Sequence, residues 1–470
     1  MSTATRNNGR LSRRDFLRLS SLAGAGAALA ACAQPPAAPA PVEATKAPAP
    51  AAPKPAEQKP ATIRFWHHWG GNRVPLMEDM IKRFQAKNPW ITVEMTLQPW
   101  EQRLEKILTG VAAGNPPDVT MLGRQDLPAF VEDNALMALD DFMKQDSVGL
   151  DLFYPAEARG SQYNGKTYIL PLPTGGALNI LWTNKAWLKQ AGLDPNKVPT
   201  TWAELTEVSQ KLTVKDGKKL KKVGVNVTAV QGGIGWFVVW LYTNGGKYVS
   251  DDLKKITINT AEGLETMKWV ADYVKNVTVG VEEVRAFYSQ TGEWQNGPFY
   301  NLFEAMMING SWEFFKIKDF APDMVPNLGV SLIPHGPKGK SQGAAYGGWG
   351  YVVPRGVKET RAAWLLTRWL CVDKEAACWF MQEQKRPSPL KSCNEDPKTA
   401  EGNPYFKNIT DIMAQDIWIP ITPVQPKIEQ TMVQMQEEVL FGRKTPEEGL
   451  KWGEAECQKL LDEYWAKKKA

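Results

Sequence analysis

Tryptophan is the residue type that most strongly suggests a binding surface, because the chain has 19 copies in 470 residues. A strand predicted at 63–66 ends in the run Trp66-His67-His68-Trp69. An indole offers a flat apolar face, and an imidazole offers hydrogen-bonding groups. Open α/β sheets hold ligands at the carboxyl ends of their strands. We therefore interpret Trp66, His67 and Trp69 as candidate ligand-binding residues, the alternative being two tryptophans that pack in the core.

Two later tryptophans stand beside small residues. Trp312 follows the turn Asn309-Gly310-Ser311, which would direct the indole outward at the end of an apolar run. Trp349 lies between Gly348 and Gly350, where a ligand could approach the backbone closely. Such indoles can pack on the apolar C–H face of a pyranose while polar side chains bind its hydroxyl groups. We include both as candidate ligand-binding residues.

Polar side chains near predicted strand ends supply the hydrogen-bonding part of such a site. Arg124 and Asp126 follow a strand predicted at 118–122, and Gln98 ends a strand predicted at 91–97. Arg124 and Asp126 could equally be solvated loop charges. The remaining candidates are Trp236, Glu293 and Arg386. The i,i+4 spacing of Trp236 and Trp240 is more typical of core packing, although a glycine-rich turn precedes Trp236.

Catalytic and metal-binding templates do not match the sequence. It lacks the dinucleotide fingerprint spacing and the zinc motif His-Glu-x-x-His. Gly339-Lys340-Ser341 resembles the end of a phosphate-binding loop, but the glycine required at 334 is Pro334. With three histidines, a histidine-based metal site is not expected. We expect no catalytic residue, no metal and no cofactor. An exported glycoside hydrolase stays open as an alternative, since it needs only a carboxylate pair such as could come from Asp126, Glu293, Glu304 and Glu313.

Four cysteines lie in the C-terminal part of the chain: Cys371, Cys378, Cys393 and Cys457. Cys371 and Cys378 fall in one helical pattern, about 10 Å apart along its axis, which is too far for a disulfide. No Cys-x-x-Cys spacing occurs. We expect buried free thiols in preference to any bridge.

The N-terminus resembles an export signal. Residues 12–18 read Ser-Arg-Arg-Asp-Phe-Leu-Arg, which is similar to a twin-arginine signal, and a short alanine-rich apolar stretch follows. The run Leu29-Ala30-Ala31-Cys32 resembles a lipobox, which implies cleavage after residue 31 and lipidation of Cys32. Residues 32–61 are rich in alanine and proline and are expected to be an extended tether.

Charge and hydropathy limit the class of protein. The first 31 residues hold five arginines and one acid, which accounts for four of the five excess positive charges of the chain. The remaining body has no basic surplus for binding nucleic acid. No uninterrupted apolar run is long enough for a polytopic membrane protein, and 43% hydrophobic and 23% charged residues are typical of a globular body.

The elements that must position these residues alternate between strand and helix from about residue 62. Apolar spacing predicts a helix ending at Asn88-Pro89 and a second one ending at 114–117, each between two of the strands named above. This order argues for a parallel sheet covered by helices. Thr201–Glu204 and Thr445–Glu448 read as capping boxes that begin helices. The C-terminal third is expected to be helical at 361–384, about 427–441 and 446–466, and a buried strand is expected at 177–183.

An ordered set of motifs resembles the extracellular solute-binding protein family 1, the sugar-binding receptors of ABC importers. The motifs are Trp66–Gly71, Phe84–Val93, Gly110–Val119, Tyr163–Pro171, Asn179–Lys185, Met307–Trp312 and Gly347–Pro354. The resemblance implies an α/β fold of two lobes, with a hinge and a ligand cleft between them. It places lobe 1 at 62–175 plus 333–372 and lobe 2 at 176–332 plus 373–470. It also implies that Trp312 stacks on the ligand and that Asp126 and the loop of Arg386 lie on the ligand side.

The function expected from these observations is that of a receptor without catalytic activity. It would bind a carbohydrate, expected to be a neutral oligosaccharide, and deliver it to the transmembrane subunits of an ABC permease. The protein is expected to be a monomer, exported and held by its lipid at the outer face of the cytoplasmic membrane, with no nucleic-acid partner. A binding protein for a non-sugar solute is the other alternative.

Overall fold

The computed structural model describes residues 59–469, apart from 72, 100, 174–175, 231–233, 292–296, 342 and 346. The expected signal peptide, Cys32 and nearly all of the tether therefore lie outside the described residues, as does Glu293. Among the helices of the described part, none combines the length and the apolar character needed to span a bilayer.

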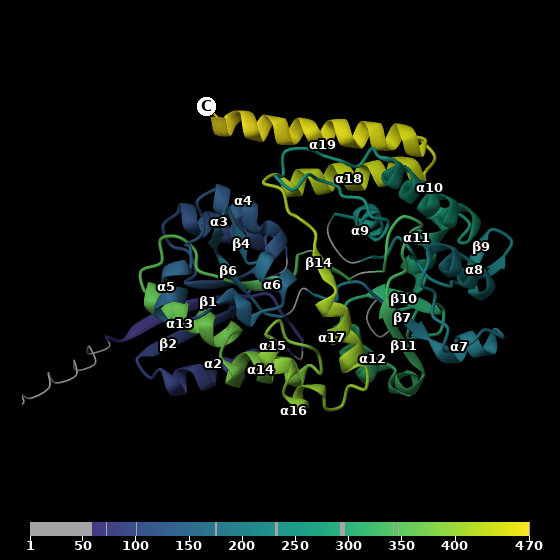
Figure 1. The fold of residues 1–470 in the computed structure, drawn as a ribbon. Helices are drawn as coiled ribbons and strands as arrows, with labels where there is room; N and C mark the ends of the chain where they lie inside the picture. Colours follow the sequence, from purple (N-terminus) through teal and green to yellow (C-terminus); the bar gives the residue numbers. More distant parts are fainter. Residues whose placement is uncertain are drawn as a thin grey trace, which may run out of the picture. The chain divides into compact units, whose positions relative to one another are not determined.

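The larger sheet has five strands in the order β2-β1-β3-β13-β6, of which Figure 1 labels β1, β2 and β6. Their bounds are β1 (Ala61–His67), β2 (Ile91–Leu97), β3 (Val119–Gly123), β6 (Ile169–Pro171) and β13 (Trp349–Val352). β1 is parallel to β2 and β3, whereas β13 is antiparallel to β3 and β6. The strands predicted at 63–66, 91–97 and 118–122 are confirmed. The central strand β3 is buried along its whole length, as its apolar composition requires.

Helices α2 (Arg73–Lys87) and α3 (Arg103–Ala112) connect the three parallel strands. α2 buries Met77, Met80, Ile81 and Phe84, the apolar face that the sequence predicts. We call the five-stranded sheet and the elements packed on it lobe 1. It includes η1 (Arg124–Asp126), α4 (Leu127–Glu132), α5 (Asp140–Gln145), η2 (Leu150–Leu152), α6 (Pro155–Arg159), β4 (Gln162–Tyr163) and β5 (Lys166–Thr167).

A three-stranded antiparallel sheet forms the centre of the second part, which we call lobe 2. Its order is β10-β7-β11, with β7 (Ile180–Asn184), β10 (Met306–Asn309) and β11 (Leu328–Leu332). Helix α9 (Trp236–Thr243) is buried on every side, so it is the centre of the lobe 2 core. The other elements are α7 (Lys185–Gln190), α8 (Trp202–Leu212), β8 (Val214–Asp216), β9 (Lys219–Lys222), α10 (Ala261–Asn276), α11 (Val281–Thr291), α12 (Glu313–Phe320), η4 (Pro322–Asn327), α17 (Phe406–Ala414), α18 (Gln425–Leu440) and α19 (Pro446–Lys469).

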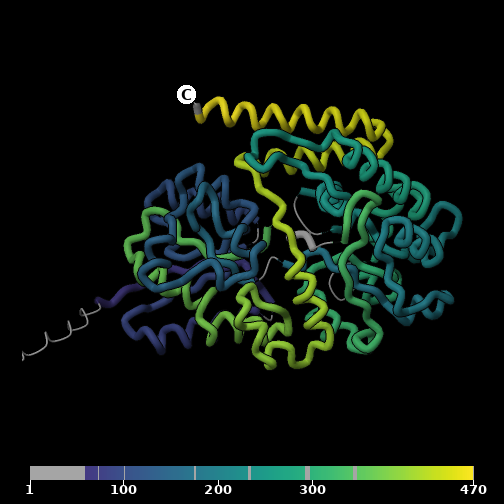
Figure 2. The backbone as a smooth tube through the Cα atoms, in the orientation of Figure 1, coloured from purple at the N-terminus to yellow at the C-terminus, as the bar shows by residue number. Residues whose placement is uncertain are grey.

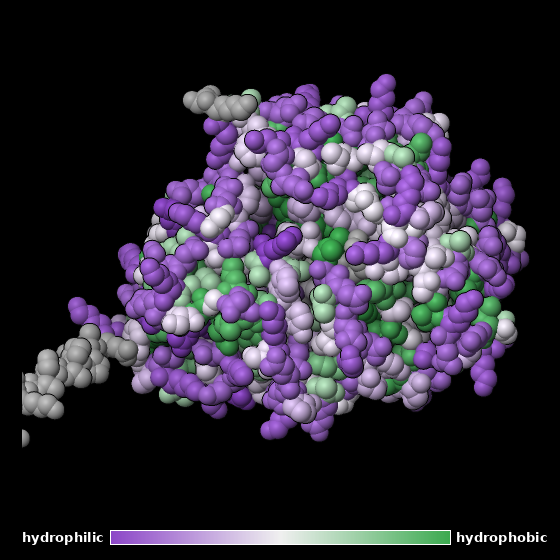
Figure 3. Space-filling model, in the orientation of Figure 1, coloured by the Kyte–Doolittle hydropathy of each residue, from purple (hydrophilic) through white to green (hydrophobic). Residues whose placement is uncertain are grey.

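The chain passes between the two lobes three times, as the tube in Figure 2 allows the reader to follow. It leaves lobe 1 after β6, returns between β11 and β13, and leaves again before α17. Two short strands lie on these passages, β12 (Gly343–Ala345) and β14 (Asp416–Trp418), and they pair in parallel. The expected α/β fold of two lobes is confirmed. On the face shown in Figure 3, hydrophilic residues predominate and apolar residues show between them.

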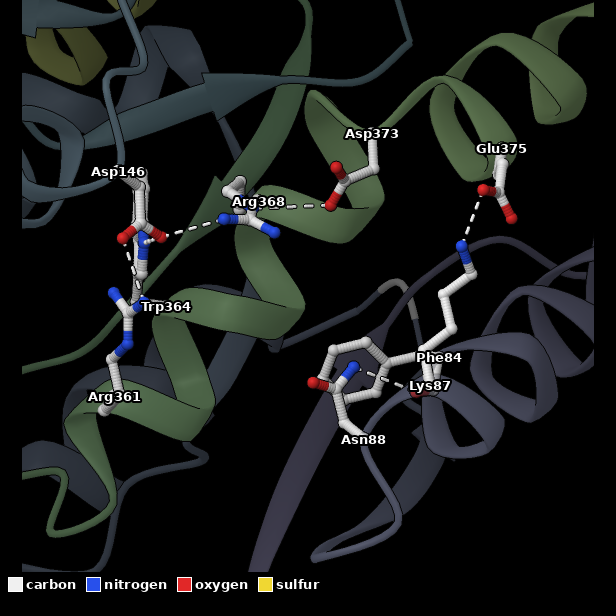
Figure 4. A network of polar contacts seen from close by, with 9 residues as sticks. All are labelled: Phe84, Lys87, Asn88, Asp146, Arg361, Trp364, Arg368, Asp373 and Glu375. Atoms are coloured by element: carbon white, nitrogen blue, oxygen red, sulfur yellow. Dashed lines mark hydrogen bonds and ion pairs between the residues drawn. The ribbon is translucent and has the colours of Figure 1, made fainter. Parts of the chain in front are cut away.

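The helical stretch expected at 361–384 is two helices, α13 (Thr360–Cys371) and α14 (Lys374–Glu383), because Val372 and Asp373 leave helical geometry. Figure 4 shows their attachment to lobe 1. After α5, Asp146 binds three side chains of α13: Arg361, Trp364 and Arg368. Lys87 of α2 pairs with Glu375 of α14 at 2.6 Å. Since α14 also packs in the core of lobe 1, we propose that lobe 2 resumes after this helix and not at residue 373.

A disulfide joins Cys378 of α14 to Cys393 of α15 (Lys391–Asn394), with 5.1 Å between the Cα atoms. The expectation of free thiols is wrong for this pair, whereas Cys371 and Cys457 are free and buried as expected. The physical reason is that the chain turns back after α14 and brings α15, followed by α16 (Pro397–Ala400), against it. Spacing within one helix does not reveal such a return.

Both predicted capping boxes are confirmed. The Thr201 side chain accepts a hydrogen bond from the Glu204 backbone, and the Glu204 side chain accepts one from the Thr201 backbone. Thr445 and Glu448 make the same reciprocal pair at the start of α19. These bonds fix where α8 and α19 begin.

Candidate functional site

The carboxyl ends of β1 and β3 lie side by side, because the two strands are parallel neighbours. β13 begins at the same edge, where Trp349 is paired with Gly123 in the antiparallel register. The backbone N–H of Arg124 donates to the carbonyl of Gly348 at 2.9 Å, which fixes the loop after β3 against the start of β13. This edge is where the fold brings together Asp126 and Trp349.

Asp126 is the carboxylate of this edge. Its side chain is buried, and burial raises its pKa to about 7 against the opposing attraction of Arg103. The charge of Glu429 on α18 of lobe 2 raises it further, so the two lobes approach each other here. The guanidinium of Arg103 lies 5.5 Å from the Trp349 ring. A carboxyl group, an indole and a guanidinium are thus within reach of one ligand, and we name Asp126, Arg103 and Trp349 the β3-edge cluster.

Arg124, although adjacent, already has internal partners. Its Nη2 lies 2.6 Å from Oε2 of Glu157, and its Nη1 donates to the Glu157 carbonyl at 3.2 Å. The Trp418 ring of β14 lies 5.7 Å from the guanidinium. Only 1% of Arg124 is exposed. Its charge is therefore neutralised within the protein, at the place where β14 meets lobe 1.

The residues of the first strand end do not form one stacking surface. Strand alternation directs Trp66 to the opposite face from His67, and Trp66 is half-buried over α3 beside a surface hollow that Gln102, Glu105 and Lys106 also line. His67 is fully buried, and burial followed by the charge of His68 lowers its pKa to about 4. The His67 imidazole is therefore uncharged at neutral pH.

Trp69 lies in the lobe 1 core, with 6% of its surface exposed. Its ring stacks on Phe380 with 5.5 Å between centroids and 11° between planes. Gln98 is half-buried, and its backbone N–H donates to the His67 carbonyl at 2.8 Å, so it holds the ends of β1 and β2 together. The structure gives Trp69 a packing role at the base of the sheet edge, and for Gln98 it gives this backbone contact.

A second group of candidates lies where β10 leads into α12. Trp312 precedes α12 and is half-buried. Its indole lies over Gly310, where an added Cβ would come within 2.1 Å of a ring carbon, so a larger residue at 310 would have to displace the ring. The guanidinium of Arg386 lies 5.8 Å from the Trp312 ring, and its Nη2 lies 3.4 Å from Ser311 Oγ. The loop after α14 thus meets the start of α12.

Trp236 is placed in the lobe 2 core at the first turn of α9, with 6% of its surface exposed. Its burial agrees with the i,i+4 spacing of Trp236 and Trp240 that is typical of core packing. Two of the carboxylates weighed for hydrolysis, Glu304 and Glu313, have internal hydrogen-bond partners. Glu304 accepts from Tyr288 at 2.7 Å, and Glu313 accepts from Asn309 at 2.9 Å and pairs with Lys316.

Three residues near these candidates were missed by the sequence reading: Arg73, Arg103 and Gln384. Arg73 and Arg103 are the first residues of α2 and α3, and a basic residue at a helix start was the available signal. Within the described residues, no group of three or more histidine, cysteine, aspartate or glutamate side chains is arranged to hold a metal ion.

A family model and several known proteins match most of the chain. The family model described as bacterial extracellular solute-binding protein matches residues 79–407. The sn-glycerol-3-phosphate-binding periplasmic protein UgpB of Shigella flexneri is 26% identical over 416 residues, covering 83% of this chain and 90% of that protein. UgpB of Escherichia coli K12 is 25% identical over the same length.

Solved structures resemble the fold over almost their whole length. CpMnBP1 with mannotriose bound has a TM-score of 0.73 and 25% identity, covering 84% of this chain and 99% of that one. An ABC transporter solute-binding protein from Thermotoga lettingae, bound with alpha-D-tagatose, has a TM-score of 0.70 and 26% identity. It covers 85% of this chain and all of that one.

Proposed function

This chain belongs to the bacterial extracellular solute-binding proteins, and from that premise we propose that it is the carbohydrate-binding receptor of an ABC importer. The observation that carries the proposal is the β3-edge cluster, since it joins an indole to a carboxyl group and a guanidinium beside α18 of the other lobe. An indole can cover the apolar face of a sugar ring, and the two charged groups can bind its hydroxyls bidentately. The bound sugars of CpMnBP1 and of the Thermotoga protein support a carbohydrate as the ligand.

The receptor would hold the ligand between the lobes and present it to the transmembrane subunits of a permease. Trp312 would supply a second stacking face from lobe 2. Of the acids weighed for hydrolysis, Glu304 and Glu313 accept hydrogen bonds from side chains of the protein. These internal partners favour binding of the sugar without its hydrolysis. Mass spectrometry of a bound sugar after prolonged incubation tests this, because a cleaved product would favour the hydrolase alternative.

The proposal is tested by thermal unfolding of the purified full chain with mannobiose, mannotriose, maltose and D-tagatose. A ligand that binds only the folded protein at a hundred times its dissociation constant stabilises it by about 2.7 kcal/mol. We expect at least one carbohydrate to raise the midpoint and to give a saturable calorimetric titration. Stabilisation by amino acids or peptides, with none by carbohydrates, would favour the non-sugar alternative.

We further propose that Cys32 carries the lipid that anchors this receptor at the cell envelope and that Arg13-Arg14 direct its export. Detergent partitioning of the wild type and of Cys32→Ala tests the anchor. The wild type should enter the detergent phase and the variant should stay in the aqueous phase. Aqueous partitioning of both would contradict lipidation, and normal export after both arginines are changed to lysine would contradict the twin-arginine route.

A further inference from the structure

Two buried arginines differ in whether a carboxylate neutralises them. Arg124 pairs with Glu157 at 2.6 Å, as described above. Arg386 is equally buried, with 3% exposed, yet none of the described carboxylates lies within 4.0 Å of its guanidinium. Its Nε has no hydrogen-bond partner among the described residues, and Nη2 has only the 3.4 Å contact with Ser311. Since a buried charge is normally paired, Arg386 lacks a counter-charge that a ligand could supply.

A second guanidinium, that of Arg73 in lobe 1, lies near the guanidinium of Arg386. Nε of Arg73 donates to Oε1 of Gln384 at 3.2 Å, two residues before Arg386, and its guanidinium lies 5.8 Å from the Trp69 ring. Burial, and then the charge of Arg73, lower the pKa of Arg386 to about 9. The charge of Glu157 acts in the opposite direction, but Arg124 already neutralises it. The two arginines are thus close enough to repel each other.

Helix α2 adds a third positive contribution. It is 15 residues long, starts at Arg73, and has no acidic residue in its first turn. The N-terminus of a helix carries a partial positive charge and favours a bound anion, whereas a cation there is unfavourable without one. Arg73, Arg386 and this helix terminus therefore place positive charge at one position, beside the indole of Trp312.

We propose that Arg73, Arg386 and Ser311 form an anion subsite, which binds a carboxylate or phosphate group carried by the sugar ligand. The inference rests on the proposed function, because Trp312 would hold the sugar ring while the arginines hold its charged substituent. A planar guanidinium fork matches the two oxygens of a carboxylate or phosphate, and Ser311 can donate one more hydrogen bond. The subsite makes the ligand an acidic sugar or a sugar phosphate, in place of the neutral oligosaccharide expected from the sequence.

The subsite can be tested without knowing the sugar. Thermal unfolding of the full chain is measured with sodium phosphate and with sodium glucuronate, each against sodium chloride at the same ionic strength. We expect both anions, or one of them, to raise the unfolding midpoint of the wild type and not that of Arg386→Gln or Arg73→Gln. Stabilisation by phosphate alone would indicate a sugar phosphate, and stabilisation by glucuronate alone would indicate a uronate. Equal midpoints in all three salts would overturn the subsite.

Matched ligands then separate the subsite from the receptor function. Calorimetric titration compares digalacturonate with galactobiose, and sn-glycerol-3-phosphate with glycerol. We expect the acidic member of at least one pair to bind about tenfold more tightly at low salt, with the difference shrinking as salt is added. Arg386→Gln should abolish the difference, whereas Arg386→Lys should retain part of it.

Lys82→Gln is the matched control, since Lys82 is exposed on the same helix and its loss removes the same charge. It should leave the preference unchanged. Arg386→Gln should also unfold at the same or a higher midpoint than the wild type without ligand, because it removes an uncompensated charge. Neutral sugars that bind while their acidic partners bind no better would overturn the subsite and leave the receptor intact. If no carbohydrate or anion binds at all, the proposed function itself fails.

Discussion

At the scale of single residues, buried charge is satisfied unevenly around the candidate site. Arg124 and Glu157 neutralise each other, and the backbone N–H of Gly176 donates to the same Glu157 at 2.7 Å. Asp126 instead has a pKa of about 7, because burial outweighs the attraction of Arg103. Groups whose charge is not satisfied inside a protein concentrate at binding sites. This contrast distinguishes the Arg124–Glu157 ion pair, which has a structural role, from Asp126, which we assign to ligand binding.

Trp312 and Trp69 should respond differently to replacement by alanine. Trp312 is half-buried, so Trp312→Ala should weaken binding by about 1.5–3 kcal/mol and leave the fold intact. Trp69 packs on Phe380 in the core, so Trp69→Ala should cost about 3–5 kcal/mol of stability and change affinity little. Calorimetric titration with denaturant melts measures both quantities. A large stability loss with unchanged affinity in Trp312→Ala would make Trp312 a core residue.

The raised pKa of Asp126 predicts a specific pH dependence of stability. The unfolded carboxyl titrates near 3.9 and the folded one at about 7, so between these values the folded state binds more protons. The free energy of unfolding should therefore fall as the pH rises from about 4 to 7. Asp126→Asn should remove this contribution and flatten the profile relative to the wild type. Denaturant melts across that range test it, and parallel profiles for the two proteins would contradict the prediction.

At the scale of elements, the sequence predicts what local periodicity encodes. The apolar face of α2 and the alternation in β2 were identified correctly because each pattern is complete within one element. The pairing of β13 with β3 was not predicted, since β13 is four residues long and comes from more than two hundred residues later. The same reason hid Gln384 beside Arg73, a contact between residues 311 positions apart. The site is formed by residues that are distant in the sequence and close in the fold, and local spacing gives no information about such contacts.

The disulfide between α14 and α15 should contribute measurably to stability. It closes a loop of 15 residues, for which the loss of unfolded-state entropy is about 3 kcal/mol. The double variant Cys378→Ala, Cys393→Ala should lose stability of that order in denaturant melts. Dithiothreitol should lower the stability of the wild type toward that of the double variant and leave the double variant unchanged. Insensitivity of the wild type to the reductant, after thiol labelling shows full reduction, would contradict the prediction.

At the scale of the whole molecule, α19 joins the two lobes through residues that are not members of the β3-edge cluster. Most of the helix belongs to lobe 2, where Cys457 and Leu461 are in the core and Trp465 Nε1 donates to the Leu253 carbonyl at 3.2 Å. Near its end, Lys468 pairs with Glu132 of α4 in lobe 1 at 2.6 Å. The same Glu132 accepts from Tyr163 at 2.9 Å. Burial would raise the pKa of Glu132, but hydrogen bonds from Lys468, Tyr464 and Tyr163 outweigh it and lower the pKa.

This contact should favour the arrangement in which the lobes are together, and so favour ligand binding. Lys468→Met and Glu132→Gln should each weaken the affinity for a sugar ligand by about twofold to fivefold, as expected for a partly exposed ion pair. The double variant should weaken it no further than Glu132→Gln does, because the ion pair that Lys468→Met removes is already lost when Glu132 is changed. The pKa of Glu132 is lower in the folded protein than in the unfolded chain. The contribution of this contact is therefore present at pH values above the unfolded pKa and is lost as the pH falls through the folded pKa.

Lys467→Met provides the control, because Lys467 is exposed on the same turn and the change in charge is identical. Fluorescence transfer between dyes at positions 82 and 211, on α2 of lobe 1 and α8 of lobe 2, reports the distance between the lobes. Without ligand, Lys468→Met should increase that distance relative to the wild type and to Lys467→Met. The faster dissociation of ligand that follows would show that the affinity loss comes from opening, since position 468 lies outside the β3-edge cluster. If the distance stays the same while affinity falls equally in both lysine variants, the contact has only a general electrostatic effect.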